Sequence, residues 1–266
     1  MTPLELMLLG SVAGAGAGLL AGLVGIGGGI VVVPVVYYAL TSSGVSGNEA
    51  AHVAVATSLA AIMPASIVSF LGHWRAGNAD VGFLREWGPG MVIGVVTAQA
   101  IAPHVRGGLM AAVFGLLCLV FAIRFGFPKW FRPLVDQPPG GPFRHIASVV
   151  IGASSGFAGI GGGILTNIIM TLSGLPMHKS IGRAAAAGIA VSIPAAIVAA
   201  LASRGTQATE IGSVDIAIWA CIAPAQTVTA WFGAGLAARI SAEHLSRVFA
   251  VALACTGTVM LHSGLA

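Results

Sequence analysis

Long apolar segments, separated by short polar ones, make up most of the chain. Eight long intervals lack Asp, Glu, Lys and Arg, and the two longest lie between Glu5 and Glu49 and between Arg144 and Lys179. Since roughly 20 helical residues cross the hydrocarbon core of a bilayer, each shorter interval predicts one membrane-spanning helix. The two longest intervals each have a glycine cluster near the middle, which predicts a helical element broken there, either as a re-entrant hairpin or as two full crossings.

The composition supports the same interpretation. Only 8% of the 266 residues are charged and 57% are hydrophobic, whereas Asp, Glu, Lys and Arg make up about a quarter of an average soluble domain. A soluble enzyme, a disordered regulator and a disulfide-rich secreted module are therefore excluded. The net charge of +4 is too dilute for a nucleic-acid-binding surface. We expect an all-α polytopic membrane protein that lies in the lipid bilayer, binds no nucleic acid and needs no cofactor.

Two sequence motifs occur twice, in the same order. Residues 22–30 (GLVGIGGGI) match residues 156–164 (GFAGIGGGI) at seven of nine positions. Downstream, residues 64–68 (PASIV) match residues 194–198 (PAAIV), with nearly the same offset along the chain. One match could arise by chance in a glycine-rich chain, but two in the same order indicate an internal duplication.

The basic residues indicate how the two copies are oriented. If each broken element begins and ends on one side and the central linker is cytoplasmic, ten basic residues lie at the cytoplasmic face and two outside, as the positive-inside rule favours. If each broken element crosses the membrane once instead, seven basic residues lie at the cytoplasmic face and five outside. We predict inverted repeats at residues 1–126 and 144–266, a cytoplasmic Pro- and Gly-rich linker at residues 127–143, and both termini in the periplasm. The ten residues are Arg75, Arg85, Arg124, Lys129, Arg132, Arg144, Lys179, Arg183, Arg239 and Arg247, and the two outside are Arg106 and Arg204.

The glycine clusters are the first candidates for a binding site. Broken backbone is tolerated within a membrane only where protein buries it or where it lines a cavity. Helices that begin after the clusters would offer free N–H groups and a positive dipole end, which attract anions. Close helix packing is the alternative, and it is the explanation we prefer for the small residues spaced by four before each cluster. The candidate ligand-binding glycines are Gly27, Gly28, Gly29, Gly161, Gly162 and Gly163, and the packing residues are Gly10, Gly14, Gly18, Gly22, Ser148, Gly152 and Gly156.

Polar side chains within the apolar segments are the remaining candidates, because such groups are costly in lipid. Arg183 opens a helix near the second cluster and could bind an oxyanion, although an ordinary interfacial arginine explains it at least as well. His52, at the corresponding place in the first copy, could bind an anion, carry a proton or form an interfacial hydrogen bond. Thr57 and Ser58 could orient an anion or bond to the preceding helical turn. Three amide side chains indicate either a polar cavity or interhelical hydrogen bonds: Asn167, Gln99 and Gln226.

The paired G-x-x-G-I-G-G-G elements, each followed by an apolar stretch and a proline-containing helix, resemble the TauE/SafE family of membrane permeases, often called sulfite exporters. The resemblance covers nearly the whole chain. It implies transport of sulfite, sulfoacetate or another small sulfur-containing anion across the bacterial inner membrane. The two copies differ at one point of interest. The second copy has Ala187 and Gly188 where the first has Thr57 and Ser58, so a site that uses these hydroxyl groups would be asymmetric.

These observations together predict a secondary transporter, and more specifically an exporter, that works by alternating access with its site at the repeat interface. The alternatives are a proton- or sodium-coupled importer of an organosulfur anion and an anion channel. An intramembrane enzyme is not expected, because the chain lacks H-E-x-x-H and G-x-S-x-G motifs and clustered acidic residues. A homo-oligomer is compatible with this prediction.

Overall fold

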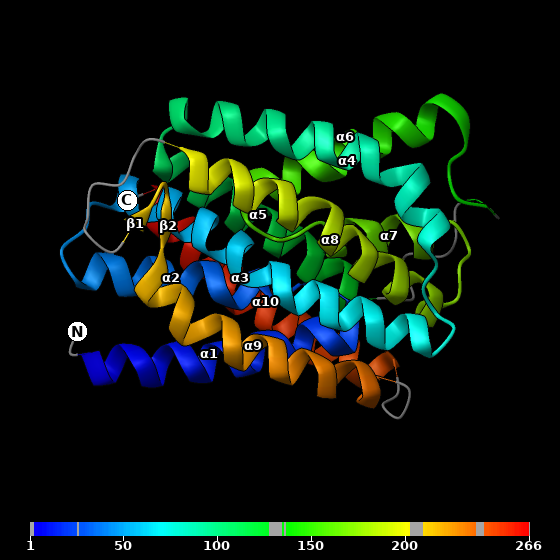
Figure 1. Ribbon diagram of the computed structural model, residues 1–266, viewed down its shortest axis with the longest axis horizontal. Helices are drawn as coiled ribbons and strands as arrows, with labels where there is room; N and C mark the ends of the chain where they lie inside the picture. The colour runs from blue at the N-terminus through cyan, green and yellow to red at the C-terminus, as the bar shows by residue number, and fades with distance from the viewer. Residues whose placement is uncertain are drawn as a thin grey trace.

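The computed structural model describes residues 3–25, 27–127, 135, 137–202, 210–237 and 242–265, which form ten α-helices, a short 3₁₀ helix and a small β-hairpin (Figure 1). The first half contains α1 (Pro3–Val24), α2 (Gly29–Ser42), α3 (Gly47–Arg75), α4 (Val81–Ile101), η1 (Ala102–His104) and α5 (Gly107–Gly126). The second half contains α6 (Gly141–Ala158), α7 (Gly163–Leu172), α8 (Met177–Leu201), β1 (Glu210–Ile211), β2 (Val214–Asp215), α9 (Ile216–Leu236) and α10 (Ala242–Leu265). The basic residues Lys129, Arg132, Arg204 and Arg239 lie outside the described residues.

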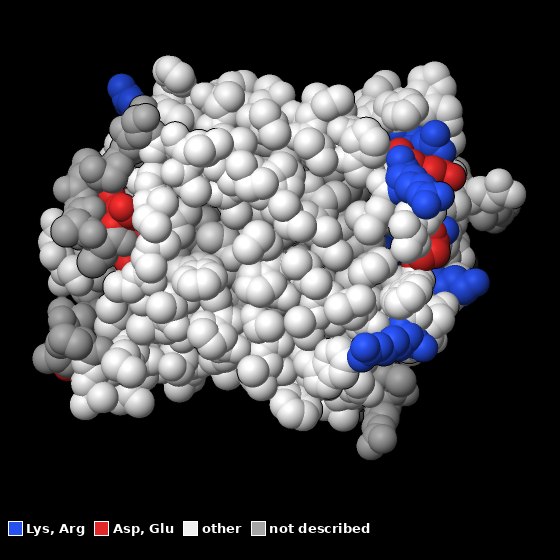
Figure 2. All heavy atoms as spheres, in the orientation of Figure 1, with Lys and Arg blue, Asp and Glu red and all other residues white. Residues whose placement is uncertain are grey.

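The prediction of an all-α polytopic membrane protein is confirmed. Within the described residues, five helices are long and apolar enough to cross a bilayer, namely α1, α3, α5, α8 and α9. Each half also has the predicted order of elements: one broken helical element (α1 and α2, or α6 and α7) is followed by three further helices. Figure 2 shows a wide band without charged side chains between the two ends of the molecule, and most of the visible Lys and Arg side chains gather at its right end.

Glycines with a left-handed backbone interrupt the chain at the same places in both halves. Helix α1 is followed by Gly25 at a φ of 71°, and Gly27 and Gly28 have φ values of 82° and 79°. After α6, Gly159, Gly161 and Gly162 have φ values of 73°, 79° and 80°. Only glycine adopts this conformation without steric cost. We call Gly25, Gly27 and Gly28 the first tip and residues 159–162 the second tip.

The two halves pack against each other through equivalent helices. Helix α3 packs against α8 and α5 packs against α10, while α1 packs against α9 and α6 against α4. In Figure 1, α3 runs from left to right and α8 from right to left; α4 and α9 likewise run in opposite directions. These directions are the ones that inverted repeats require. The inversion across a bilayer and the domain boundaries stay predictions.

The small residues spaced by four in α1 and α6 lie in helix interfaces, which confirms the packing interpretation. A Cβ atom on Gly14 or Gly18 would overlap the carbonyl oxygen of Ile222 or Gln226 in α9. In the second half, a Cβ atom on Gly152 would overlap the carbonyl oxygen of Met91 in α4. The absence of a side chain therefore lets each pair of backbones approach closely enough to pack within a membrane.

Candidate functional site

The two glycine tips meet in the middle of the molecule. A Cβ atom on Gly27 or on Gly161 would lie 3.0 Å from Cγ2 of Ile62, which stands halfway along α3. A Cβ atom on Gly29 would overlap the carbonyl oxygen of Gly159. The two copies of the duplicated motif thus come into contact at mid-length of the long helices.

Helices α2 and α7 both begin at these tips, with Gly28 and Gly162 as their N-cap residues. Neither glycine supplies a side chain that could accept a hydrogen bond from the first turn. Within the described part of the chain, the N–H groups of Gly163 and Ile164 donate to no backbone carbonyl. Two positive helix ends are therefore directed toward one central region, which is an arrangement that attracts a negative charge.

Side chains from the opposite half donate hydrogen bonds to carbonyl groups at or beside each tip. The Gln226 Nε2 group of α9 donates to the Gly27 carbonyl at 2.8 Å, and the Ser58 hydroxyl of α3 donates to the Gly159 carbonyl at 3.0 Å. The Gln99 Nε2 group of α4 donates to the carbonyl of Gly156, in the last turn of α6, at 2.8 Å. The broken helical elements thus have donors for carbonyl groups that a continuous helix would satisfy internally. Gln99 thus forms the interhelical hydrogen bond, and Gln226 bonds to the loop between α1 and α2; Gln99 also lines a cavity, so its two alternatives do not exclude each other.

Three polar atoms near the tips have no hydrogen-bond partner among the described residues: Thr166 Oγ1, Asn167 Nδ2 and Gln226 Oε1. Thr166 and Asn167 are 0% and 1% exposed and lie in the first turns of α7. Helical side chains lean toward the helix N-terminus, so both lean toward the second tip. Leaving such a group without a partner costs about 1–3 kcal/mol. The Thr166 hydroxyl and the Asn167 Nδ2 group are thus buried donors without an acceptor among the described residues, in addition to the N–H groups at the start of α7.

The comparison with known families establishes what kind of protein has this arrangement. Residues 11–260 match the family described as Sulfite exporter TauE/SafE. The chain belongs to the TauE/SafE family. It is similar to a probable membrane transporter protein of Haemophilus influenzae, with 29% identity over 187 residues that cover 70% of this chain and 71% of the relative. A probable membrane transporter protein of Methanocaldococcus jannaschii is 26% identical over 256 residues, which cover 92% of this chain and 91% of the relative.

No solved structure matches the chain. The family and the two relatives identify this TauE/SafE family member as a membrane transporter.

Thr57 lies between the two halves of the transporter. Thr57 is fully buried, and its hydroxyl oxygen accepts a hydrogen bond at 3.0 Å from the N–H group of Asp215, at the start of α9. This contact joins the two halves, and Thr57 points neither to the preceding turn nor to a tip glycine.

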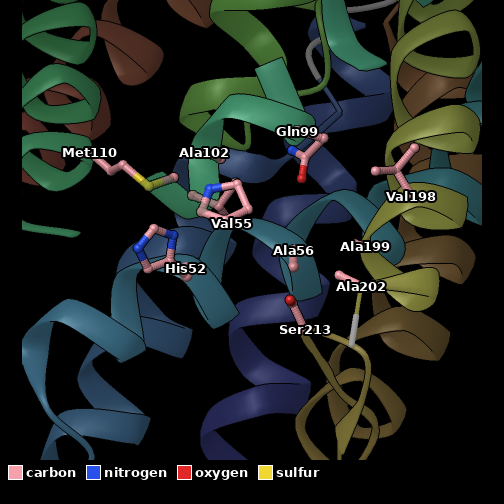
Figure 3. A pocket seen from close by; sticks show the side chains of 11 residues that line it. His52, Val55, Ala56, Gln99, Ala102, Met110, Val198, Ala199, Ala202 and Ser213 are labelled. Atoms are coloured by element: carbon pink, nitrogen blue, oxygen red, sulfur yellow. The ribbon is translucent and has the colours of Figure 1, made fainter. Parts of the chain in front are cut away.

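His52 lines a cavity of about 40 Å³ that Gln99 and Ser213 also line. Figure 3 shows His52 and Met110 on one side of this cavity and Val198 of α8 on the other. His52 and Gln99 are therefore brought together. The tip glycines do not line this cavity, but it adjoins the second tip, because a Cβ atom on Gly159 would lie 3.2 Å from Cα of Val55, which lines the cavity.

Arg183 lies in a second, larger cavity of about 280 Å³ that we call the basic-end cavity. Its lining residues are Asp80, Gly82, Phe83, Glu86, Trp87, Pro138, Pro139, Gly140, Arg144 and Arg183. The tip glycines do not line this cavity either.

Two features of these sites were not among the sequence candidates. Thr166 was not singled out, although its position beside Asn167 in an apolar run is a signal that could have found it. The grouping of Arg144 with two carboxylates was not foreseen either, because these residues are distant in the chain.

Proposed function

We propose that the protein is a secondary transporter that moves a small sulfur-containing anion, such as sulfite or sulfoacetate, by alternating access. The observation that carries the proposal is the meeting of two left-handed glycine tips in mid-molecule, next to buried polar atoms that lack partners among the described residues. The family description, Sulfite exporter TauE/SafE, supports the sulfur-containing substrate. The anion would be held between the N-termini of α2 and α7, with the Asn167 amide and the Thr166 hydroxyl as donors.

The packing of the tips favours a carrier over a channel. Gly29 approaches Gly159 so closely that no side chain fits between them, and Ile62 lies against both tips. A continuous pore would have to pass this contact, whereas a carrier separates such a contact only during its cycle. The near-equivalent packing of the two halves is the kind of arrangement through which alternating access operates in inverted-repeat transporters.

We also propose that the basic end of the molecule faces the cytoplasm of a bacterial inner membrane and that transport is outward. Helix α1 begins and α10 ends at the left end of Figure 1, opposite the end at which the basic side chains gather in Figure 2. An inside-negative potential favours anion exit by about 2.3 kcal/mol per charge per 100 mV. Export of a dianion therefore needs no coupled ion.

Proteoliposomes loaded with radiolabelled sulfite or sulfoacetate test the proposal. We expect saturable, protein-dependent efflux that accelerates when a potassium gradient with valinomycin makes the interior negative. Vesicles without protein and vesicles loaded with labelled chloride are the controls. Uptake that requires a proton or sodium gradient would favour the importer, and non-saturable flux would favour the channel. The absence of protein-dependent flux for every sulfur anion tested would refute the proposal.

A further inference from the structure

The basic-end cavity lies between the two halves of the transporter. Asp80 and Glu86 belong to the start of α4 in the first half, and Arg144 and Arg183 belong to α6 and α8 in the second half. Pro139, from the segment that leads into α6, also lines the cavity. The cavity of about 280 Å³ has room for a small oxyanion together with water.

Each arginine in this cavity is paired with a carboxylate of the other half. Arg144 Nη1 lies 2.8 Å from Glu86 Oε2, and Arg183 Nε lies 3.9 Å from Asp80 Oδ2. Both arginine side chains are 26% exposed, whereas those of Glu86 and Asp80 are 58% and 57% exposed. Ion pairs that water reaches so readily are weak. The carboxylates are thus more open to water than the guanidinium groups that face them, and one oxygen of Asp80, Oδ1, is already used as the cap of α4, where it accepts a hydrogen bond from the Phe83 N–H group at 2.7 Å.

Arg144 also has a donor that its carboxylate partner does not use. Its Nε atom is buried and has no hydrogen-bond partner among the residues that the structure describes. A guanidinium group presents its N–H donors in a planar fork that matches an oxyanion. The ion pair with Glu86 therefore leaves part of the binding capacity of Arg144 unsatisfied.

The surroundings of Arg183 fix its position without neutralising it. Its Nη1 group donates to the Met170 sulfur at 3.4 Å, and its guanidinium carbon lies 5.7 Å from the centre of the Phe83 ring. Phe83 is stacked on Trp87 at 5.5 Å, and both rings are buried. Neither the thioether nor the ring carries a negative charge. Arg183 is therefore a preorganised cation, and the counterion nearest to it among the residues lining this cavity is Asp80, whose Oδ2 atom lies 3.9 Å from its Nε atom.

We propose that the basic-end cavity is a second binding site for small oxyanions, where the anion replaces Asp80 and Glu86 as the partner of Arg183 and Arg144. The proposal rests on the proposed function, because it adds an access site to the same transport path. The charges of the four groups cancel, so an anion enters by competing with the carboxylates. Since both ion pairs link the halves, their replacement also removes two connections that hold the halves together at this end.

Equilibrium binding of radiolabelled sulfite to the full chain in detergent tests the proposal at low ionic strength. Sulfite should bind at two sites, and replacing Arg144 or Arg183 by glutamine should raise the dissociation constant of one of them at least about tenfold, because a charge-assisted hydrogen bond to the anion is lost there, while the site at the tips is unchanged. Glu86→Gln should lower the same dissociation constant by about two- to fivefold, because a competing carboxylate is removed. The matched control is Arg85→Gln, which changes an exposed arginine of α4 that does not line the cavity.

A charge-neutral double variant separates ligand binding from structural support. Glu86→Gln combined with Arg144→Gln removes both charges of the ion pair and leaves two amides that can bond to each other, and we expect it to fold but to bind sulfite more weakly than the wild-type chain. Recovery of wild-type affinity in the double variant would overturn the proposal. The proposal is also overturned if Glu86→Gln weakens binding, if the arginine variants bind normally, or if the wild-type chain binds no sulfite.

The binding measurement also distinguishes this proposal from the proposed function. Arginine-dependent binding without any flux in proteoliposomes would refute transport of sulfite and leave the cavity as a binding site. Saturable sulfite flux with an unchanged KM in the Arg144, Arg183 and Glu86 variants would refute the proposal that the cavity binds the anion, and it would leave the proposed transport function in place.

Discussion

The amide of Asn167 allows a test in which stability and transport change in opposite directions. Asn167 is 1% exposed and its Nδ2 atom has no partner among the described residues. The first copy of the duplicated motif has Val33 at the corresponding place. Valine is close to asparagine in size, so Asn167→Val removes the polar group without opening a large cavity. The variant gives the second half the residue that the first half already contains.

The expected magnitudes follow from the burial of this group. Removing a buried donor that lacks an acceptor should raise the free energy of unfolding by about 1–3 kcal/mol. For a chain of this size each kcal/mol raises Tm by about 2–4 °C. If Asn167 donates to the transported anion, the lost hydrogen bond to a charged group is worth about 1.5–3 kcal/mol, which corresponds to a KM about 10- to 150-fold higher.

Two assays measure these effects on the same preparations. Thermal unfolding in detergent without substrate gives Tm, and initial rates of sulfite efflux from proteoliposomes give KM. Ile168→Val is the matched control, because it changes the next residue of α7 without altering a polar group; it should lower Tm slightly and leave KM unchanged. A lower Tm with an unchanged KM for Asn167→Val would refute the reasoning, because the amide would then have a structural partner and no ligand.

Two further substitutions test the architecture of the tips. Gly28→Ala should lower the free energy of unfolding by at least about 1–2 kcal/mol, because its φ of 79° is left-handed and its new Cβ atom would lie 2.6 Å from a carbonyl oxygen of α1. The control is Gly16→Ala, which adds a Cβ atom in open space on α1 and should raise the free energy of unfolding by about 0.5–1 kcal/mol. Equal Tm changes in the two glycine variants would contradict this. Ser58→Ala should lower the free energy of unfolding by about 1–3 kcal/mol, because the buried Gly159 carbonyl loses its donor. The control is Ser154→Ala, which removes an exposed hydroxyl that bonds only within α6 and should leave Tm nearly unchanged. A similar Tm for both serine variants would argue against the hydrogen bond between the halves.

Part of the candidate site could be predicted from the sequence, and the limits have a physical cause. The tip glycines and Asn167 could be identified because consecutive glycines and a lone amide are unusual in apolar segments, whatever surrounds them. The partners of the polar side chains could not be identified in this way. Ser58 and Gln226 bond to carbonyl groups 101 and 199 residues away, and no local pattern encodes such a distance.

The amino-acid sequence by itself determined the helical class, the membrane location, the duplication and the places where the helices break. These properties follow from local quantities: the spacing of charges relative to bilayer thickness and the freedom of glycine to adopt positive φ. Only the tertiary structure decided that the tips touch across Ile62, that Thr166 joins Asn167 as a group without a partner among the described residues, and that Arg183 faces Asp80. These contacts depend on how the two halves pack, and packing between distant segments is set by the shapes and polar groups of all the helices together.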